Sequence, residues 1–474
     1  MKKIRIIGGG LAGPEAALQA ASLGCNVDLY EMRPTRSTEA HQTADFAELV
    51  CSNSLKSESE NTAPWLLKQE MRRAGSILLA EADASSVPAG HALAVDRVEF
   101  SRRVAERIAA FTTGPDARIT IHREEVTTLN PDEPDTLTVL ATGPLTSPAL
   151  AAELQRLTGS DHLAFYDSIS PIVDASTIDM DKVFFAARYD KGTADYINCP
   201  FTKEEYETFL DALTTAEAVP LKDWEGNALS SLSSRREADG SASLPPATPA
   251  HYFEGCLPIE ETARRGRDTL RFGPMKPVGL TDPKTGRWPY AAVQLRQENL
   301  RADSYNLVGF QNHLKFGEQA RVLRLIPGLE NATFLRYGQI HRNTYIDAPN
   351  LLTETLQLRA HPSILIAGQL SGIEGYTESI ASGLLAGRYA AALARGEQPT
   401  PAPRATANGS LSYYITHALN PEKHKRFQPA NITFDLLPPL EEELRRKIRD
   451  KKERHKIQCD RALEAWDAWL AASN

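Results

Sequence analysis

The sequence predicts an α/β protein built on a parallel sheet that the chain visits three times. Residues 3–32 and 361–396 each read as strand, glycine-containing loop and helix, and residues 136–148 read as a buried strand that ends in Ala-Thr-Gly. Strands that alternate with helices in this way are typical of a parallel sheet covered by helices. We therefore expect one domain assembled from both ends of the chain.

The length and composition fit this plan. A chain of 474 residues is too long for one compact core, and 42% hydrophobic with 24% charged residues is ordinary for a globular protein. We expect a discontinuous Rossmann-like domain from residues 1–150 and 355–400 and a smaller inserted mixed α/β domain from residues 151–354. Residues 401–474 are expected to form a C-terminal helical region with a basic helix.

The first segment can be assigned element by element. Ile4 to Ile7 form an apolar run that reads as the first strand and is too short for a signal peptide. The alanine-rich residues 14–22 predict a helix that Gly24 ends, and residues 26–31 return to a β pattern. The segment is therefore a strand, turn, helix, strand unit.

Gly8, Gly10 and Gly13 lie between that strand and that helix in the spacing Gly-x-Gly-x-x-Gly, and Glu31 closes the next strand. Bare backbone lets a pyrophosphate approach the helix N-terminus, and a carboxylate can accept hydrogen bonds from ribose hydroxyls. The glycine pattern alone fits any tight turn. With the strand, helix and acid in place, it predicts a dinucleotide site.

Later segments favour FAD over NAD. Thr142 and Gly143 end the middle strand, and a helix follows the last glycine-containing loop; both features resemble parts of FAD-dependent oxidoreductases. Asp96-Arg97 resembles a further segment of such proteins, with a surface ion pair as the alternative. The remaining cofactor contacts are expected from Gly368, Gln369, Gly375 and Tyr376.

The net charge of −8 gives no general attraction for nucleic acid, because phosphate binding depends on Lys and Arg. Local basic stretches lie at residues 262–276 and 441–458, and the second also reads as a solvated amphipathic helix with ion pairs. Residues 225–250 are predicted to form a surface loop or a partly disordered insertion, and residues 396–410 a proline-rich linker.

The cysteines indicate a reducing compartment and two candidate nucleophiles. Five cysteines without a C-x-x-C pair argue against disulfides, and no apolar run is long enough for a membrane helix, so a soluble cytoplasmic protein is predicted. Cys51 precedes hydroxyl and amide residues and then Lys56, and Cys256 precedes Arg264 and Arg265. Nearby cations favour the thiolate, whereas the alternative is a small buried side chain. We rank Cys25, Cys199 and Cys459 lower.

Longer stretches combine into a specific pattern. They include FAELVCSNSLKS (46–57), FEGCLPIE (253–260), LVGFQNHLKFGEQ (307–319), AGQLSGIEGYTESIASGLLAG (367–387) and FQPANITFDLLPPL (427–440). Together they resemble the folate-dependent tRNA uracil-5 methyltransferase family (TrmFO, formerly Gid) over most of the chain. The Ser-, Ala- and Pro-rich loop before His251 looks longer than that family needs.

The resemblance implies an FAD enzyme that transfers a one-carbon unit from 5,10-methylenetetrahydrofolate to C5 of the T-loop uridine in tRNA. Flavin reduced by NAD(P)H supplies the reducing equivalents, and the T-arm of tRNA is the RNA partner. No metal ion, membrane or obligate protein partner is expected.

Methyl transfer to uracil C5 explains why such an enzyme needs a cysteine. Uracil C5 is a poor nucleophile, and addition of a thiolate to C6 enables C5 to attack an electrophilic methylene carbon. Matched through FEGCLP and ELVCSNS, Cys256 is the favoured nucleophile and Cys51 an assistant or general acid/base. The sequence leaves the reverse assignment open.

The resemblance also suggests substrate contacts. Glu374 could accept hydrogen bonds from a pterin, or could be an acid at a helix N-terminus, and Tyr376 could stack or belong to the core. His341 and Arg342, with the neighbouring Asn343, could contact the folate tail or the tRNA, or make structural polar contacts. Phosphate contacts are expected from Arg264, Arg265, Arg267 and the basic tail.

Two other functions compete with methyl transfer. A flavin oxidoreductase acting on a small metabolite predicts no affinity for tRNA and indifference to the loss of Cys256. A non-catalytic FAD- and tRNA-binding protein predicts that the loss of Cys51 and Cys256 together leaves the biological effect intact.

Overall fold

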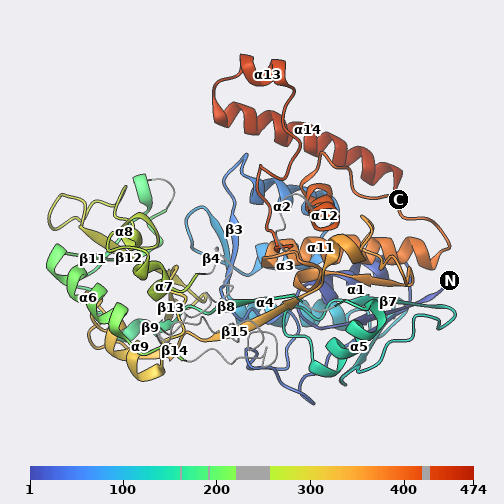
Figure 1. Cartoon of the computed structure of the whole chain (residues 1–474), viewed down its shortest axis with the longest axis horizontal. Helices are drawn as coiled ribbons and strands as arrows, with labels where there is room; N and C mark the ends of the chain where they lie inside the picture. Colours follow the sequence, from blue (N-terminus) through green and yellow to red (C-terminus); the bar gives the residue numbers. More distant parts are fainter. Residues whose placement is uncertain (161–162, 191–192, 220–256, 419–426, 474) are drawn as a thin grey trace, which may run out of the picture.

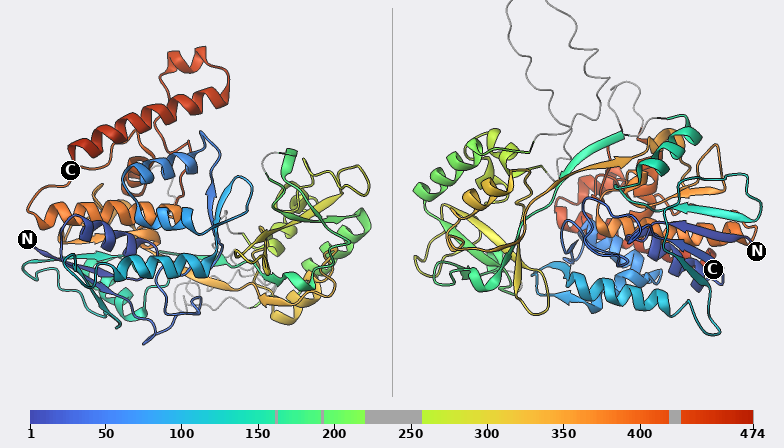
Figure 2. Two further views of the ribbon diagram at one scale, coloured as in Figure 1. Left: turned by 180° about the vertical axis from the view of Figure 1, so that it is seen from behind. Right: turned by 90° about the horizontal axis from the view of Figure 1, so that it is seen from below.

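The structure, a computed structural model, describes residues 1–160, 163–190, 193–219, 257–418 and 427–473. Figure 1 shows a larger lobe that carries both ends of the chain and a smaller lobe from the middle of the sequence. An antiparallel ribbon of β8 (Leu163–Ser168) and β15 (Ile340–Tyr345) joins the lobes. Figure 2 shows both strands crossing between them.

The larger lobe is centred on a five-stranded sheet in which every neighbouring pair of strands is parallel. The strand order is β16 (Ile364–Ile366), β7 (Thr136–Leu140), β1 (Lys3–Ile7), β2 (Val27–Tyr30) and β6 (Ile119–His122). The three segments predicted from the sequence all supply strands to this sheet. The predicted α/β fold class is confirmed.

Helices α1 (Ala12–Ser22) and α11 (Tyr376–Ala394) pack closely against each other beside this sheet. The first matches the predicted helix and is followed by Gly24 in a left-handed conformation, with φ +82°. A Cβ on Gly383 or Gly387 of α11 would overlap a backbone carbonyl oxygen of α1. Small residues therefore set the spacing of the two helices.

The rest of the larger lobe surrounds this unit. It contains α2 (Ala63–Arg73), α3 (Ile77–Ala84), α4 (Arg97–Ala109), α5 (Pro148–Thr158), α10 (Ala348–Leu351) and a small sheet of β3 (Ser54–Ser57), β5 (Ala92–Val95) and β4 (Ser86–Val87). Asp96 caps α4 by accepting hydrogen bonds from the backbone of Val98 and Glu99. Arg97 forms an ion pair with Glu298, so the alternative of a surface pair between Asp96 and Arg97 is wrong.

The smaller lobe has its own hydrophobic core, which draws on residues from Val173 to Ala332. Its antiparallel sheet has the order β10 (Phe184–Phe185), β11 (Ile197–Phe201), β12 (Ala291–Gln297), β13 (Ser304–Leu307), β9 (Ile172–Asp174) and β14 (Phe334–Arg336). Its helices are α6 (Lys203–Thr215), α7 (Ile259–Arg264), α8 (Thr269–Phe272) and α9 (Phe316–Leu323). The predicted loop at residues 225–250 lies outside the described residues.

The C-terminal helices are α12 (Ala407–His417), α13 (Glu442–Lys447) and α14 (Lys451–Ala472). Figure 1 shows α13 and the start of α14 projecting from the larger lobe, while the far end of α14 packs on it through Trp466, whose Nε1 donates to the Glu70 carbonyl at 2.7 Å. The expected solvated helix with i,i+4 ion pairs at residues 441–458 is present but divided in two, because Asp450 caps a new helix after a break, and exposed i,i+4 ion pairs lie on both parts. The predicted linker also ends early, since Thr406 caps α12. None of the described helices is long and apolar enough to cross a membrane.

Candidate functional site

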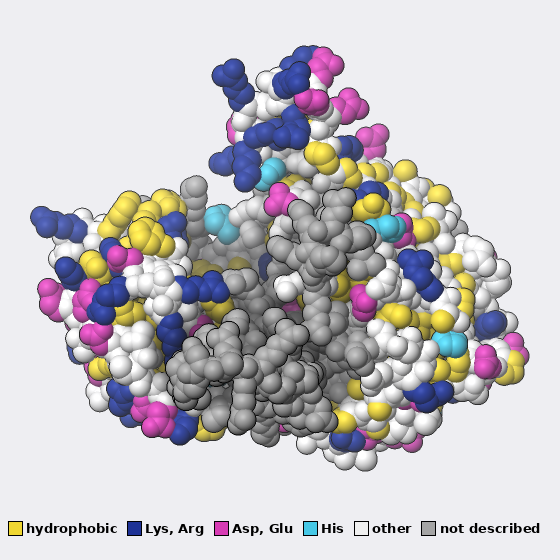
Figure 3. All heavy atoms as spheres, in the orientation of Figure 1, with side chains coloured by type: hydrophobic (Ala, Val, Ile, Leu, Met, Phe, Trp, Pro, Cys, Tyr) yellow, Lys and Arg dark blue, Asp and Glu magenta, His cyan; other side chains and the backbone are white. Residues whose placement is uncertain are grey.

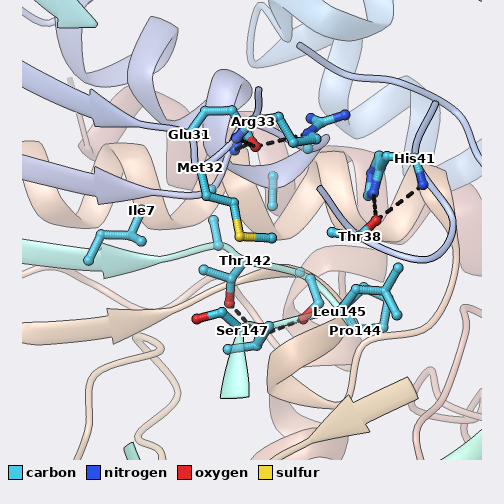
Figure 4. A pocket seen from close by; sticks show the side chains of 18 of the residues that line it. Ile7, Glu31, Met32, Arg33, Thr38, His41, Thr142, Pro144, Leu145 and Ser147 are labelled. Carbon is cyan, nitrogen blue, oxygen red and sulfur yellow. Dashed lines mark hydrogen bonds and ion pairs between the residues drawn. The ribbon is translucent and has the colours of Figure 1, made fainter. Parts of the chain in front are cut away.

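A cavity of about 990 Å³, its open mouth included, lies at the carboxyl ends of the parallel strands. Each of the five strands is followed by residues that line it, as expected for ligand sites in open α/β sheets. Figure 4 shows Glu31, Met32 and Arg33 on one side and Thr142, Pro144 and Leu145 on the other. The predicted cofactor residues that line it are Gly8, Gly10, Glu31, Thr142, Gly143, Gly368, Gln369 and Tyr376.

The three motif glycines have different roles. Gly8 has φ +119°, and a Cβ there would overlap the carbonyl oxygen of Ala141. Gly13 does not line the cavity, and a Cβ on it would overlap the Gly8 carbonyl, so it sets the packing of α1 on the strand end. A Cβ on Gly10 would meet nothing within 4 Å, so its bare backbone faces open space. Of the three motif glycines, only Gly10 leaves room for a ligand where a side chain would otherwise lie.

The N-terminus of α1 opens on the cavity through Leu11 and Ala12. No side chain caps its first turn among the described residues, and Pro14 has no N–H group. The unsatisfied N–H groups and the helix dipole favour a negative charge at this end. The arrangement therefore fits the pyrophosphate of a dinucleotide.

Glu31 provides a buried negative charge beside the glycine turn. Its Oε2 accepts from Gly9 N at 2.7 Å, and its Oε1 accepts from Arg33 N at 2.9 Å and Arg33 Nε at 2.8 Å. Burial raises the pKa of Glu31, but the hydrogen bonds and charge of Arg33 outweigh burial and hold the pKa below its ordinary value. Oε2 retains capacity for a ribose hydroxyl, so the residue fits its predicted role.

The loop after β2 supplies cavity residues that sequence reasoning missed. Arg33 donates to Glu48 Oε2 at 2.9 Å, and His41 Nδ1 lies 2.7 Å from Thr38 Oγ1. Burial and the charge of Arg33 lower the pKa of His41 to about 4, so this imidazole is neutral. The signal of these loop residues in the sequence is their position, directly after the predicted strand that Glu31 closes.

Cys51 lies at the edge of this cavity. It follows the lining residue Val50, and its backbone N–H donates to the Tyr376 hydroxyl at 2.6 Å. Its Sγ lies 3.7 Å from the carbonyl oxygen of Ser168. Burial, and after it the neighbouring Cys51, raise the pKa of Tyr376 far above its ordinary value, so the hydroxyl stays protonated.

The other described cysteines lie in different surroundings. Cys25, Cys199 and Cys459 are buried, and burial raises the pKa of each thiol, that of Cys459 to about 12. A buried thiol with a raised pKa is a poor nucleophile. Cys51 is the one partly exposed cysteine in the described part of the chain. Cys256 lies outside that part.

Two arginines hold the segment that carries Cys51. Arg97 donates to the Leu49 carbonyl at 2.7 Å, and Arg296 of β12 donates to Ser52 Oγ at 2.8 Å and Asn53 Oδ1 at 2.9 Å. Lys56, the cation suggested by the sequence, instead forms a 2.5 Å ion pair with buried Glu378. The loop is thus fixed from both lobes, because Arg296 belongs to the smaller lobe and Arg97 to the larger one.

Gln369 and Glu374 form a pair behind the cavity wall. The Gln369 amide lines the cavity and donates to both Glu374 carboxylate oxygens, at 2.9 and 2.8 Å. Glu374 is buried and does not line this cavity. Gly375, also outside the lining, has φ +110°, and a Cβ on it would lie within 3 Å of Lys56 Nζ. Gly375 therefore leaves room for the ion pair between Lys56 and Glu378.

The other predicted substrate residues lie in the smaller lobe and on the ribbon. His341 and Arg342 are on β15, and their side chains are outside the described part; Asn343 is buried. Arg264 and Arg265 are exposed at the end of α7, where Arg264 pairs with Glu261. Arg267 pairs with Asp211 and Glu207. The structure does not bring these arginines to the cavity lining.

Comparisons with known proteins give consistent matches. The profile of the family Glucose inhibited division protein A matches residues 3–240 and 244–398. A Koribacter versatilis protein named methylenetetrahydrofolate–tRNA-(uracil-5-)-methyltransferase TrmFO is 65% identical over 99% of this chain and 98% of the relative. An Enterococcus faecalis protein of the same name is 52% identical over 98% of this chain and 97% of its own. The solved structure of GidA from Aquifex aeolicus shares the fold, with a TM-score of 0.66 at 15% identity over 99% of this chain and 74% of that one.

Proposed function

The chain belongs to the family of methylenetetrahydrofolate–tRNA-(uracil-5-)-methyltransferases, TrmFO, and we propose that it methylates uracil at C5 in tRNA with methylenetetrahydrofolate as carbon donor. The target is the T-loop uridine. The observation that carries this proposal is the hydrogen bond between Cys51 N and Tyr376, which places a thiol at the edge of a dinucleotide cavity. The competing function, a flavin oxidoreductase acting on a small metabolite, requires the cavity but does not require a cysteine beside it.

FAD is the proposed dinucleotide. The backbone at Gly10 and the N-terminus of α1 would hold its pyrophosphate, and Glu31 a ribose hydroxyl. Thr142, Gly368 and Tyr376 line the remainder of the cavity. When bound and reduced with NAD(P)H, the flavin supplies the reducing equivalents that make the transferred carbon a methyl group.

The protein's thiols would activate the uracil. A thiolate adds to C6, the electron pair shifts to C5, and C5 attacks the methylene carbon of the folate. A base then removes the proton from C5 as the bond between the methylene carbon and the folate nitrogen breaks, which releases tetrahydrofolate and leaves an exocyclic methylene group on C5. A hydride, which the reduced flavin would supply when bound, turns this methylene into a methyl group, and the electron pair returned to C5 expels the sulfur from C6 as thiolate. We assign the addition to Cys256 and the proton transfer to Cys51, whose position is fixed by Tyr376, Arg97 and Arg296.

The proposed contacts with flavin, folate and tRNA come from different parts of the chain. Residues 1–150 and 355–400 would hold the flavin, and residues 151–354 would add folate and RNA contacts. Glu374, His341 and Arg342 are the proposed folate-side residues, and Arg264, Arg265 and the basic start of α14 the proposed phosphate contacts for the T-arm. The target base must leave its stack to reach the cavity.

The test incubates the purified protein with an unmodified tRNA transcript, methylenetetrahydrofolate and NADH or NADPH, and measures 5-methyluridine. Product should require every component and should vanish when the T-loop uridine is replaced by cytidine. Cys51→Ala and Cys256→Ala should lower the rate at least 10²-fold, whereas Cys199→Ala is the matched thiol control. Product formed only with S-adenosylmethionine, or turnover of a small metabolite without tRNA, would refute the proposal.

A further inference from the structure

Large aromatic side chains are exposed on the smaller lobe around α8. Phe272 is 81% exposed, Trp288 56% and Tyr189 54%, although such side chains are usually buried. Figure 3 shows hydrophobic side chains gathered over this part of the lobe with Lys and Arg among them. We call the surface of residues 188–189 and 271–290 the α8 surface. Clustered exposed aromatics mark an interaction site more often than scattered ones do.

Backbone contacts join these residues into one surface. Tyr189 N donates to the Gly279 carbonyl at 2.7 Å, and Ala292 N donates to the Met275 carbonyl at 3.1 Å. Arg271 beside Phe272 donates to the Tyr290 carbonyl at 3.0 Å, with its guanidinium 3.7 Å from the ring centroid of Tyr290. The aromatic groups are therefore held on a fixed framework.

The charge of the α8 surface differs from that of the whole chain. Its residues 188–189 and 271–290 contain five Lys and Arg against one Asp, whereas the chain has a net charge of −8. Of these cations, Arg271 forms an ion pair with Asp268. Within the part of the chain that the structure describes, no carboxylate forms an ion pair with exposed Lys276, Lys284 or Arg287. Unpaired cations beside exposed rings fit a polyanion that also presents flat apolar groups.

We propose that Phe272 and Trp288 are a stacking platform for unpaired bases of the tRNA, with Lys276, Lys284 and Arg287 bound to the flanking phosphates. This inference rests on the proposed function and names a contact surface away from the cavity. Aromatic stacking tolerates any base, and nearby cations supply the backbone attraction. A second copy of the chain is a poorer occupant, because a symmetric contact would bring like charges together.

The experiment measures the Kd of the flavin-loaded protein for a tRNA transcript and for a blunt RNA duplex of equal charge. Phe272→Ala and Trp288→Ala should each weaken tRNA binding about 5- to 100-fold and leave duplex binding nearly unchanged. The KM for tRNA should rise while kcat at saturating tRNA stays the same. Lys284→Ala and Arg287→Ala should each lower the salt slope of binding by roughly 1.

Phe316→Ala is the matched control, because Phe316 is 53% exposed on α9 and stacks on Tyr337 instead of lying on the α8 surface. Wild-type protein that binds and methylates tRNA, together with aromatic variants that bind it equally well, would overturn the platform and leave the proposed function standing. Equal losses on duplex and tRNA, or a wild-type dimer that the variants dissociate, would also overturn it. Wild-type protein that neither binds nor methylates tRNA would overturn the proposed function itself.

Discussion

The dinucleotide cavity and the loop that carries Cys51 meet at Tyr376, yet they are built in different ways. The cavity comes from residues that directly follow parallel strands, with the glycine turn and Glu31 within one strand, helix, strand unit. The Cys51 loop is held by side chains distant in sequence: Tyr376 is 325 residues away, and Arg296 is 244 residues from Ser52. We infer that damage to the first should release the cofactor, whereas damage to the second should slow the chemistry of a flavin-loaded protein.

The largest effect is expected from Gly13→Val. A Cβ at this position would overlap the Gly8 carbonyl, so α1 cannot keep its distance from the strand end. We expect a loss of about 3 kcal/mol or more of stability together with loss of flavin. Flavin absorbance per chain and the thermal midpoint are the measurements. Gly317→Ala, in a helix where a Cβ meets nothing within 4 Å, is the control and should keep both values. A yellow, normally stable Gly13→Val protein would contradict this view of the turn.

The next largest effect is expected from a change in the support of the Cys51 loop. Arg296→Gln removes the group that holds Ser52 and Asn53 from the smaller lobe, and leaves their oxygens without that donor. Because small misplacements of reacting groups are costly, we expect about a 10²-fold fall in kcat with flavin content near normal. Methylation at saturating tRNA and flavin absorbance check both parts. Arg301→Gln, at an exposed arginine paired with Asp303, should change neither. Loss of flavin in Arg296→Gln would show that the two regions are not separable.

The same difference explains what the sequence could predict. Gly8, Gly10, Gly13 and Glu31 follow from spacing, because strand, turn and helix geometry are local. The partners of Cys51 do not follow from spacing, since a buried arginine from another lobe leaves no periodic trace in the sequence. Thus the cation close in sequence, Lys56, pairs with Glu378, whereas the cation that holds the Cys51 loop is Arg296, which is distant in sequence. The break before α14 did carry a local signal, because Asp450 is a good N-cap residue.

A smaller effect is expected where the two regions meet. Tyr376→Phe keeps the ring in the cavity wall but removes the hydroxyl that accepts hydrogen bonds from Cys51 N and Ser52 N. We expect the loss of these hydrogen bonds to raise the activation free energy by about 1–2 kcal/mol, which would lower kcat roughly 10-fold and leave flavin binding unchanged. The two values are measured on one preparation. Unchanged kcat in Tyr376→Phe would mean that the backbone of the Cys51 loop is held without this hydroxyl.

The smallest effect on the reaction is expected from Glu70, which lies away from both regions and so separates stability from function. Its carboxylate accepts from Ala407 N at 2.6 Å and Asn408 N at 2.9 Å, and burial, opposed by these bonds, raises the pKa of Glu70 to about 7. The folded state therefore binds more protons than the unfolded state between about pH 4.5 and 7, and the free energy of unfolding should fall as pH rises through this window. Glu70→Gln cannot ionise, so its unfolding free energy should lose about 2 kcal/mol less than the wild type across that window. Denaturant unfolding at pH 5 and pH 7.5 measures this difference, while flavin content and kcat of the folded variant should match the wild type. If the unfolding free energies of the wild type and Glu70→Gln change equally with pH, the prediction is contradicted. The hydrogen bonds from α12 would then offset the effect of burial, and the pKa of Glu70 would be the same in the folded and unfolded states.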